Sequence, residues 1–268
     1  MITAIALGLA LTLGAAQDAM EDPDPTRCEQ ASAATFVLEG PVNAAMADCV
    51  REQLAPTTTE LVVDSGGGDI RYALDIAELL EPLTLTVRVR DRCYSSCANY
   101  FLPLAKRLIV QPGAVIVVHG GADPQFLQAE VGRRGQRIHE IMRETGVDRA
   151  EAETRHEAAV AGVRTLLERQ EAFAVRHQVG KGWFLYREEN DSDVGRWLSG
   201  ERGPKPHPFG WRLMLVEEPM IRSCLPDVEI EPFQQRLEAE FIDNRDRYGR
   251  FRRAEGLRSL TLECADPA

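Results

Sequence analysis

The chain has 268 residues, of which 44% are hydrophobic and 27% charged, enough for one large domain or two small ones with an ordinary core. Its formal net charge is −11, and no basic run is longer than three residues. This excludes a surface built for nucleic acid, because such a surface needs clustered Lys and Arg to replace phosphate counterions.

The first residues are typical of a secretory signal. An apolar run over 5–13 is followed by Gly14-Ala15-Ala16 and then by an acidic, proline-containing stretch. We predict a signal peptide over 1–16, cleaved after Ala16, and a linker over 17–33. The run is too short to span a bilayer comfortably, although an apolar first helix or an uncleaved anchor stays open. We therefore expect a periplasmic or secreted protein.

Six cysteines are even in number, and their spacing does not suggest a metal site. In an exported chain they are expected to form disulfides. Six cysteines allow about 15 pairings, and sequence alone cannot choose among them. Their local arrangement favours Cys28–Cys49, Cys93–Cys97 and Cys224–Cys264. If the chain is not exported, the same residues are buried thiols.

From residue 34 to residue 118 the sequence alternates short apolar strands with amphipathic helices, separated by glycine and proline. This order predicts an α/β fold in which a parallel sheet is flanked by helices through right-handed crossovers. The expected strands are 34–40, 61–63, 83–89, 108–110 and 115–118, and the expected helices are 42–54, 70–80 and 94–105.

The rest of the chain carries weaker signals. After Pro124 there is no proline up to His177, which predicts two or three charged helices broken near Gly146. Its histidines, 139, 156 and 177, are expected to be exposed rather than catalytic. Residues 180–208 are irregular, 212–216 fit a last strand, and 231–262 fit a charged helix. We assign 34–216 to one α/β domain and 217–268 to a helical C-terminal extension.

Three short motifs between Leu61 and Gly120 carry the chemistry. Ser65-Gly66-Gly67-Gly68-Asp69 follows a buried strand, and its glycines allow backbone N–H groups to face an oxyanion. Ser95 lies at a helix start within Cys93-Tyr94-Ser95-Ser96-Cys97. His119 ends an apolar strand, 24 residues after Ser95. Each motif also has a structural interpretation, as a glycine turn, an N-cap serine or a structural histidine.

In this order and spacing, the motifs over residues 58–121 resemble the Clp-protease/crotonase superfamily, and more closely an exported, Clp-like branch of serine hydrolases. The resemblance implies a Clp/crotonase-like α/β fold. It also implies Ser95 as nucleophile, His119 as general base, and the N–H groups of Gly68 and Ser96 as oxyanion hole. Ser96 is the alternative nucleophile if the helix starts one residue later.

At the third member of the triad, this sequence departs from the pattern of the family it resembles. In the Clp-type motif an Asp precedes an Arg-aromatic-Leu-Ser run, but here the residue before Arg196-Trp197-Leu198-Ser199 is Gly195. Asp193, two positions earlier, is our candidate acid, and Asp191 or a Ser–His dyad remain alternatives. Without a carboxylate the imidazole would be poorly oriented as a base.

The leading hypothesis is an exported serine hydrolase, a peptidase acting on a peptide or protein substrate without a metal or organic cofactor. The resemblance also implies a homo-oligomer, and it leaves open an ATPase or membrane partner. The principal alternative is a catalytically inactive Clp-like fold used as a binding or scaffold protein. A third hypothesis is acyl-transfer or thioesterase chemistry on the same oxyanion hole.

Overall fold

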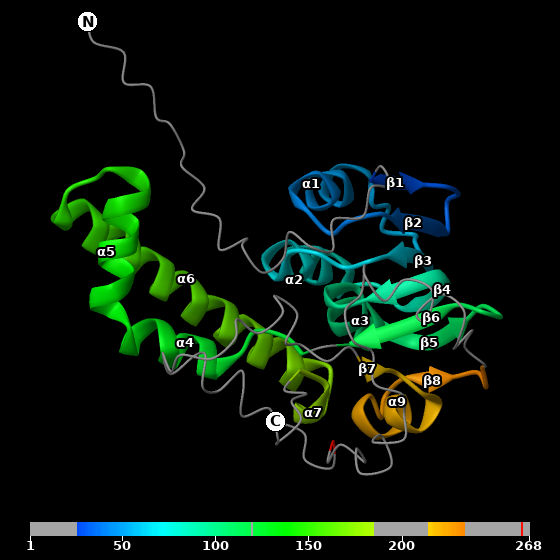
Figure 1. Cartoon of the computed structure of the whole chain (residues 1–268). Coiled ribbons are helices and arrows are strands. Elements are labelled where there is room, and N and C mark those ends of the chain that lie inside the picture. Colours follow the sequence, from blue (N-terminus) through cyan, green and yellow to red (C-terminus); the bar gives the residue numbers. More distant parts are fainter. Residues whose placement is uncertain (1–25, 119, 185–213, 234–263, 265–268) are drawn as a thin grey trace, which may run out of the picture.

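The computed structural model describes residues 26–118, 120–184, 214–233 and 264 (Figure 1). These residues form an eight-stranded sheet with the order β1-β2-β3-β4-β5-β8, while β6 pairs with β4 and β7 pairs with β6. The strands are β1 Arg27–Gln30, β2 Thr35–Glu39, β3 Glu60–Ser65, β4 Leu85–Tyr94, β5 Ala105–Val110, β6 Val115–Val118, β7 Met214–Leu215 and β8 Glu229–Ile230.

The sheet confirms the predicted α/β class. Pairings among β2, β3, β4, β5, β6 and β8 are parallel, whereas β1 and β7 each join in antiparallel orientation. The sheet is therefore mixed but mostly parallel. β1 was not anticipated, and it lies within residues 17–33, which the sequence analysis treats as a linker. The four-residue strand Arg27–Gln30 has no buried residue, so it lacks the apolar signal of the inner strands.

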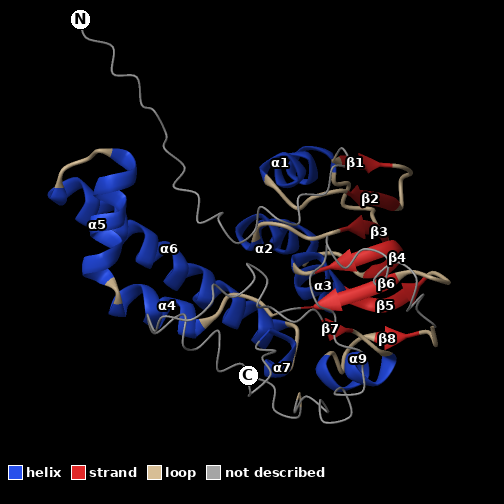
Figure 2. Cartoon of the chain, viewed as in Figure 1, coloured by secondary structure: helices blue, strands red, loops and turns tan. Residues whose placement is uncertain are grey.

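Helices α1 (Ala44–Gln53), α2 (Ile70–Leu80) and α3 (Ser96–Phe101) lie along one face of the sheet (Figure 2). Their starts follow from local chemistry: Asn43 accepts a hydrogen bond from the Met46 N–H, and Asp69 caps α2 in the same way. α3 is shorter than predicted, because Pro103 converts the last turn into a 3-10 helix over Leu102–Leu104.

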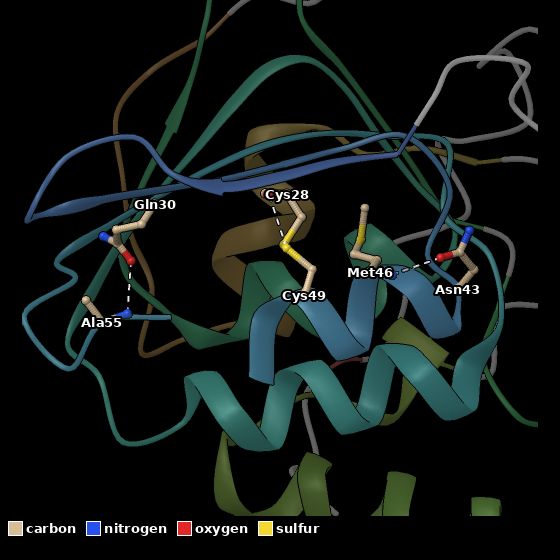
Figure 3. Close-up of a disulfide and its surroundings, with 6 residues drawn as sticks. All are labelled: Cys28, Gln30, Asn43, Met46, Cys49 and Ala55. Carbon is tan, nitrogen blue, oxygen red and sulfur yellow. Dashed lines mark hydrogen bonds between the residues drawn. A yellow bond between two sulfur atoms is a disulfide. The ribbon is translucent and has the colours of Figure 1, made fainter. Parts of the chain in front are cut away.

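The disulfide Cys28–Cys49 joins β1 to α1 (Figure 3). The same corner is held by Ala55, whose N–H donates to Gln30 Oε1 over 2.9 Å. The antiparallel edge strand is thus attached covalently to the helix that covers it.

Three helices, α4 (Pro124–Gly132), α5 (Arg134–Thr145) and α6 (Arg149–Arg176), form an arm that projects from the sheet (Figure 1). As predicted, the break lies at Gly146, whose φ of 71° ends α5 in the left-handed conformation. The prediction of exposure holds for His139 and is wrong for His156, which is buried. It also fails for His177, which is half-buried because its ring packs on Phe173 and its Nε2 bonds to Glu81.

The described part of the C-terminal region returns to the sheet. α7 (Lys181–Phe184), α9 (Glu218–Cys224) and β8 pack on the main core, and Cys224 is bonded to Cys264. The expected strand over 212–216 corresponds to the shorter β7. The predicted signal peptide over 1–16 and nearly all of the predicted helix over 231–262 lie outside the described residues. Within the described ranges, no helix combines the length and apolar character needed to cross a membrane.

Candidate active site

The glycine motif and the Ser95 motif meet where the strands β3, β4 and β6 end. Cys93 in β4 pairs with Ser65 of β3 on one side and with Ile116 of β6 on the other. All three strands run in the same direction, so their carboxyl ends lie together. In open α/β sheets this edge is where ligands bind.

Ser95 occupies the turn between strand β4 and helix α3, in an unusual backbone conformation. Its φ is 54° and its ψ is −124°, and among the described residues Gln178 is the other non-glycine residue with a positive φ. Such a conformation costs about 1–3 kcal/mol and persists only where surrounding contacts enforce it. A strained serine at a sharp strand-to-helix turn is the geometry of a nucleophile elbow, which presents the hydroxyl to substrate.

Backbone hydrogen bonds hold this turn in place. The Ser95 N–H donates to the Val117 carbonyl over 2.8 Å, which attaches the turn to β6. The Ser95 carbonyl accepts from the Asn99 N–H over 2.8 Å, which begins α3. The position of Ser95 is therefore fixed by hydrogen bonds to β6 on one side and to α3 on the other.

Burial distinguishes the two candidate nucleophiles. Ser96 is fully buried, at 0% exposure, and its Oγ has no hydrogen-bond partner. Ser95 is half-buried and so remains within reach of solvent. A nucleophile must contact substrate, so this difference favours Ser95 over Ser96.

The glycine turn after β3 lies directly against Ser95. A Cβ added at Gly67 would lie 2.7 Å from Ser95 Cβ and 2.5 Å from the Tyr94 carbonyl oxygen. One added at Gly68 would lie 2.2 Å from the Val42 carbonyl oxygen. Both glycines also have a positive φ, so no other residue fits here without moving backbone.

The same turn supplies a candidate hydrogen-bond donor. Val42 donates to the Gly67 carbonyl and accepts from the Asp69 N–H, so its backbone binds the residues on both sides of Gly68. In a parallel bridge of this kind, the intervening residue directs its own N–H away from the partner. Within the described part of the chain, neither the Gly68 N–H nor the Ser96 N–H donates a hydrogen bond. These two amides are available to an oxyanion.

A disulfide encloses the serine turn. Cys93, the penultimate residue of β4, is bonded to Cys97 in the first turn of α3, with 5.3 Å between their Cα atoms. The bond thus spans Ser95, two residues away on each side. Neither cysteine is exposed to solvent.

The segment that follows His119 is held by two buried amide side chains. Asn99 Nδ2 donates to the Gly120 carbonyl over 2.7 Å. Gln170, on α6, makes a pair of bonds with Ala122: its Oε1 accepts from the N–H over 2.8 Å and its Nε2 donates to the carbonyl over 2.9 Å. Tyr100 Oη also donates to Gln170 Oε1, over 2.7 Å.

The close fit leaves no room at Gly121, where a Cβ would lie 2.1 Å from Gln170 Oε1. Tyr100, whose hydroxyl completes this network, is fully buried, and the loss of hydration raises its pKa far above the ordinary value. The hydroxyl therefore stays protonated and acts as a donor.

Several predicted site residues lie outside the described residues. These are His119, Asp193, Asp191 and the run Arg196-Trp197-Leu198-Ser199 with Gly195 before it. The roles of His119 as base and Asp193 as acid therefore remain predictions. Ser95, Ser96 and Gly68 do come together at the sheet edge, while their catalytic roles also stay proposals.

No family model and no curated protein matches the chain. Among solved structures, a ClpP1 mutant from Listeria monocytogenes is similar to it, with 17% identity, a TM-score of 0.31, and coverage of 46% of this chain and 78% of that one. The activity of this chain must therefore be argued from its own residues.

Sequence reasoning did not find Asn99, Tyr100 and Gln170. Asn99 and Tyr100 follow the Ser95 motif directly, and a polar residue on a helix otherwise made of apolar and small residues was a usable signal for Asn99. Gln170 lies in a long charged helix, where a glutamine carries no such signal. Its role depends on a partner 48 residues away in sequence.

Proposed function

We propose that the chain is an exported serine hydrolase, acting on peptide or protein substrates, with Ser95 as its nucleophile. The observation that carries this proposal is the strained conformation of Ser95 between β4 and α3, packed against Gly67. A structural N-cap serine does not need a positive φ, because N-cap residues ordinarily adopt extended backbone. Three disulfide pairs fit an oxidising, extracytoplasmic location.

In the proposed reaction, Ser95 Oγ attacks the carbonyl carbon of the scissile bond while His119 accepts the hydroxyl proton. The N–H groups of Gly68 and Ser96 stabilise the negative charge on the former carbonyl oxygen. His119 then returns the proton to the leaving group, which departs and leaves an acyl-enzyme. Water then attacks the ester carbon while His119 accepts its proton, and His119 returns that proton to Ser95 Oγ as the bond from the acyl carbon to Ser95 breaks and the acid product leaves. Asp193 would orient the imidazole.

The finer parts of the proposal come from the sequence resemblance. Peptide substrates and self-association into a homo-oligomer are what the Clp-like motifs imply, whereas an ATPase or membrane partner is left open by them. The described residues fit the general chemistry of acyl transfer, which thioesterases share. A peptide or protein substrate is a narrower proposal than acyl transfer, and it rests on the sequence resemblance.

The test is reaction with a fluorophosphonate probe, which labels an activated serine. The oxidised, mature protein should be labelled at one site, and mass spectrometry should place the adduct on Ser95 rather than Ser96. Ser95→Ala should abolish labelling while leaving the circular dichroism spectrum unchanged. An unlabelled wild-type protein, with a trypsin control labelled in the same tube, would refute the hydrolase.

One observation favours the alternative, an inactive binding or scaffold protein. Gly195 stands where the Clp-type motif has the triad acid. The same probe separates the two functions, because a scaffold without an activated serine is not labelled at any pH.

A further inference from the structure

Three disulfides stabilise this chain, and one of them differs in what it connects. Cys28–Cys49 and Cys224–Cys264 close loops with sequence separations of 21 and 40, joining elements far apart in the chain. Cys93–Cys97 has a separation of only 4. A cross-link restricts the unfolded chain less as its loop shortens, so a general stabilising role explains this third disulfide least well.

Cys93–Cys97 connects strand β4 of the sheet to helix α3, and Ser95 lies between the two cysteines in the chain. Cys93 is held in the middle of the sheet by its pairing with Ser65 and Ile116. Cys97 lies in the first turn of α3, a helix of only six residues. Helices this short do not form without outside support. The disulfide supplies that support at the residue where the chain must change direction.

The conformation of Ser95 needs this kind of constraint. Its φ of 54° is unfavourable for a residue with a Cβ, and the turn could relax if the start of α3 moved away from β4. Gly67 closes the turn on one side by close packing, and the Ser95–Val117 hydrogen bond closes it on another. The Cys93–Cys97 bond adds a covalent limit to how far the start of α3 can move from β4.

We propose that Cys93–Cys97 is a positioning cross-link, which holds Ser95 in its reactive conformation and makes activity conditional on oxidation. This inference rests on the proposed function. The bond forms when the two thiols pass two electrons and two protons to a disulfide-bearing oxidant, which becomes a dithiol. Because both cysteines are fully buried in the folded protein, the bond is protected afterwards from external reductants. A chain that folds under reducing conditions would remain inactive.

The chain contains its own matched control. Cys28–Cys49 joins β1 to α1 (Figure 3), and neither cysteine belongs to the three motifs at the site. We compare Cys93→Ala/Cys97→Ala with Cys28→Ala/Cys49→Ala, measuring the rate of fluorophosphonate labelling and the midpoint of thermal unfolding. Both variants should unfold at lower temperature. Labelling should stay at the wild-type rate without Cys28–Cys49 and fall by about 100-fold without Cys93–Cys97, as expected for a misplaced catalytic group.

A second measurement keeps both side chains in the core. Wild-type protein is refolded with dithiothreitol or with glutathione disulfide, and labelling is measured on the folded monomer or oligomer recovered by gel filtration. The reduced, folded protein should remain unlabelled, and later oxidation in mild denaturant should restore labelling. If the Cys93→Ala/Cys97→Ala variant does not fold, this arm still tests the inference, because a reduced, folded protein that is labelled at the wild-type rate would overturn it.

The outcomes separate the inference from the function on which it rests. If wild-type protein is labelled and the folded Cys93–Cys97 variant or reduced protein is labelled as fast, the positioning role is overturned while the hydrolase stands. If oxidised wild-type protein is not labelled at all, the hydrolase itself fails. Equal loss of labelling in both cysteine variants would also overturn the inference, because it would reflect general destabilisation.

Discussion

Asn99 joins the serine turn to the segment that follows His119. Its backbone N–H binds the Ser95 carbonyl over 2.8 Å, and its side-chain Nδ2 binds the Gly120 carbonyl over 2.7 Å. Both bonds are buried, and Gly120 is the next residue in the chain after the candidate base. The distance between the Ser95 turn and Gly120 therefore depends on one side chain, as well as on the sheet.

Replacing this side chain should reduce activity more than stability. In Asn99→Leu the Gly120 carbonyl loses a buried partner, which should lower the free energy of unfolding by about 1–3 kcal/mol. Displacement of Gly120, and with it of the preceding candidate base His119, should slow probe labelling by about 100-fold. Thr58→Val, which removes a similarly buried hydroxyl bonded to Gln30, is the control and should keep labelling. Equal labelling in both variants would show that Asn99 is only structural.

The two glycines at the site should not tolerate a methyl group. Gly67→Ala places a Cβ 2.5 Å from a backbone oxygen, so the turn and Ser95 must move. We expect labelling to be lost. Gly146→Ala is the matched control, because Gly146 also has a positive φ but has open space around it. It should cost about 1 kcal/mol of stability, measured by urea unfolding, without loss of labelling.

Relieving the strain at Ser95 should stabilise the protein and inactivate it. Glycine adopts the observed φ of 54° without a steric penalty. Ser95→Gly should therefore raise the free energy of unfolding by about 1 kcal/mol, after allowing for the greater freedom of glycine in the unfolded chain. Thermal unfolding measures this directly. A destabilised Ser95→Gly variant would contradict the claim that the conformation is strained.

Removal of either Ser95 or His119 should have the same effect on activity. Ser95→Ala and His119→Ala should both reduce turnover to a similar, near-background level, because neither residue acts alone. Asp193→Asn should lower the rate strongly, whereas Asp191→Asn should not. If both Asn variants keep full activity, a dyad or another carboxylate such as Glu188 or Glu189 orients the base. Steady-state kinetics on a labelled peptide library would make the comparison.

An ion pair on the sheet predicts a pH effect on stability. Arg90 donates to Glu39 over 2.6 Å, and this bond lowers the pKa of Glu39 below its ordinary value of 4.5. A carboxyl group with a lowered pKa in the folded state stabilises the fold at pH above its unfolded pKa, and loses that effect as the pH falls through its folded pKa. Glu39→Gln should therefore destabilise the protein at pH 7.

The same comparison at low pH supplies the control. Below the folded-state pKa of Glu39 the carboxyl is protonated in both states, so wild type and Glu39→Gln should have nearly the same stability. Urea unfolding at about pH 7, about pH 4 and below about pH 3 measures the difference in stability between the two proteins, because these pH values span the ordinary pKa of a glutamate carboxyl group. A difference that does not change with pH would mean that packing, not charge, is responsible.

The sequence alone predicted the features that depend on near neighbours. α2 was predicted at its observed bounds, because its apolar residues repeat with helical spacing and Asp69 caps its start. The serine between a strand and a helix, and the glycines after a buried strand, were visible for the same local reason. Such patterns need no knowledge of the rest of the chain.

Only the tertiary structure decided which groups act together. The choice between Ser95 and Ser96 depends on burial, and the bond from Asn99 to Gly120 spans 21 residues. The contact between Tyr100 and Gln170 spans 70 residues. These pairs exist because β4 is long enough to pair with β5 near its start and with β6 near its end. Sheet order of this kind is a property of the whole core, so no local window of sequence contains it.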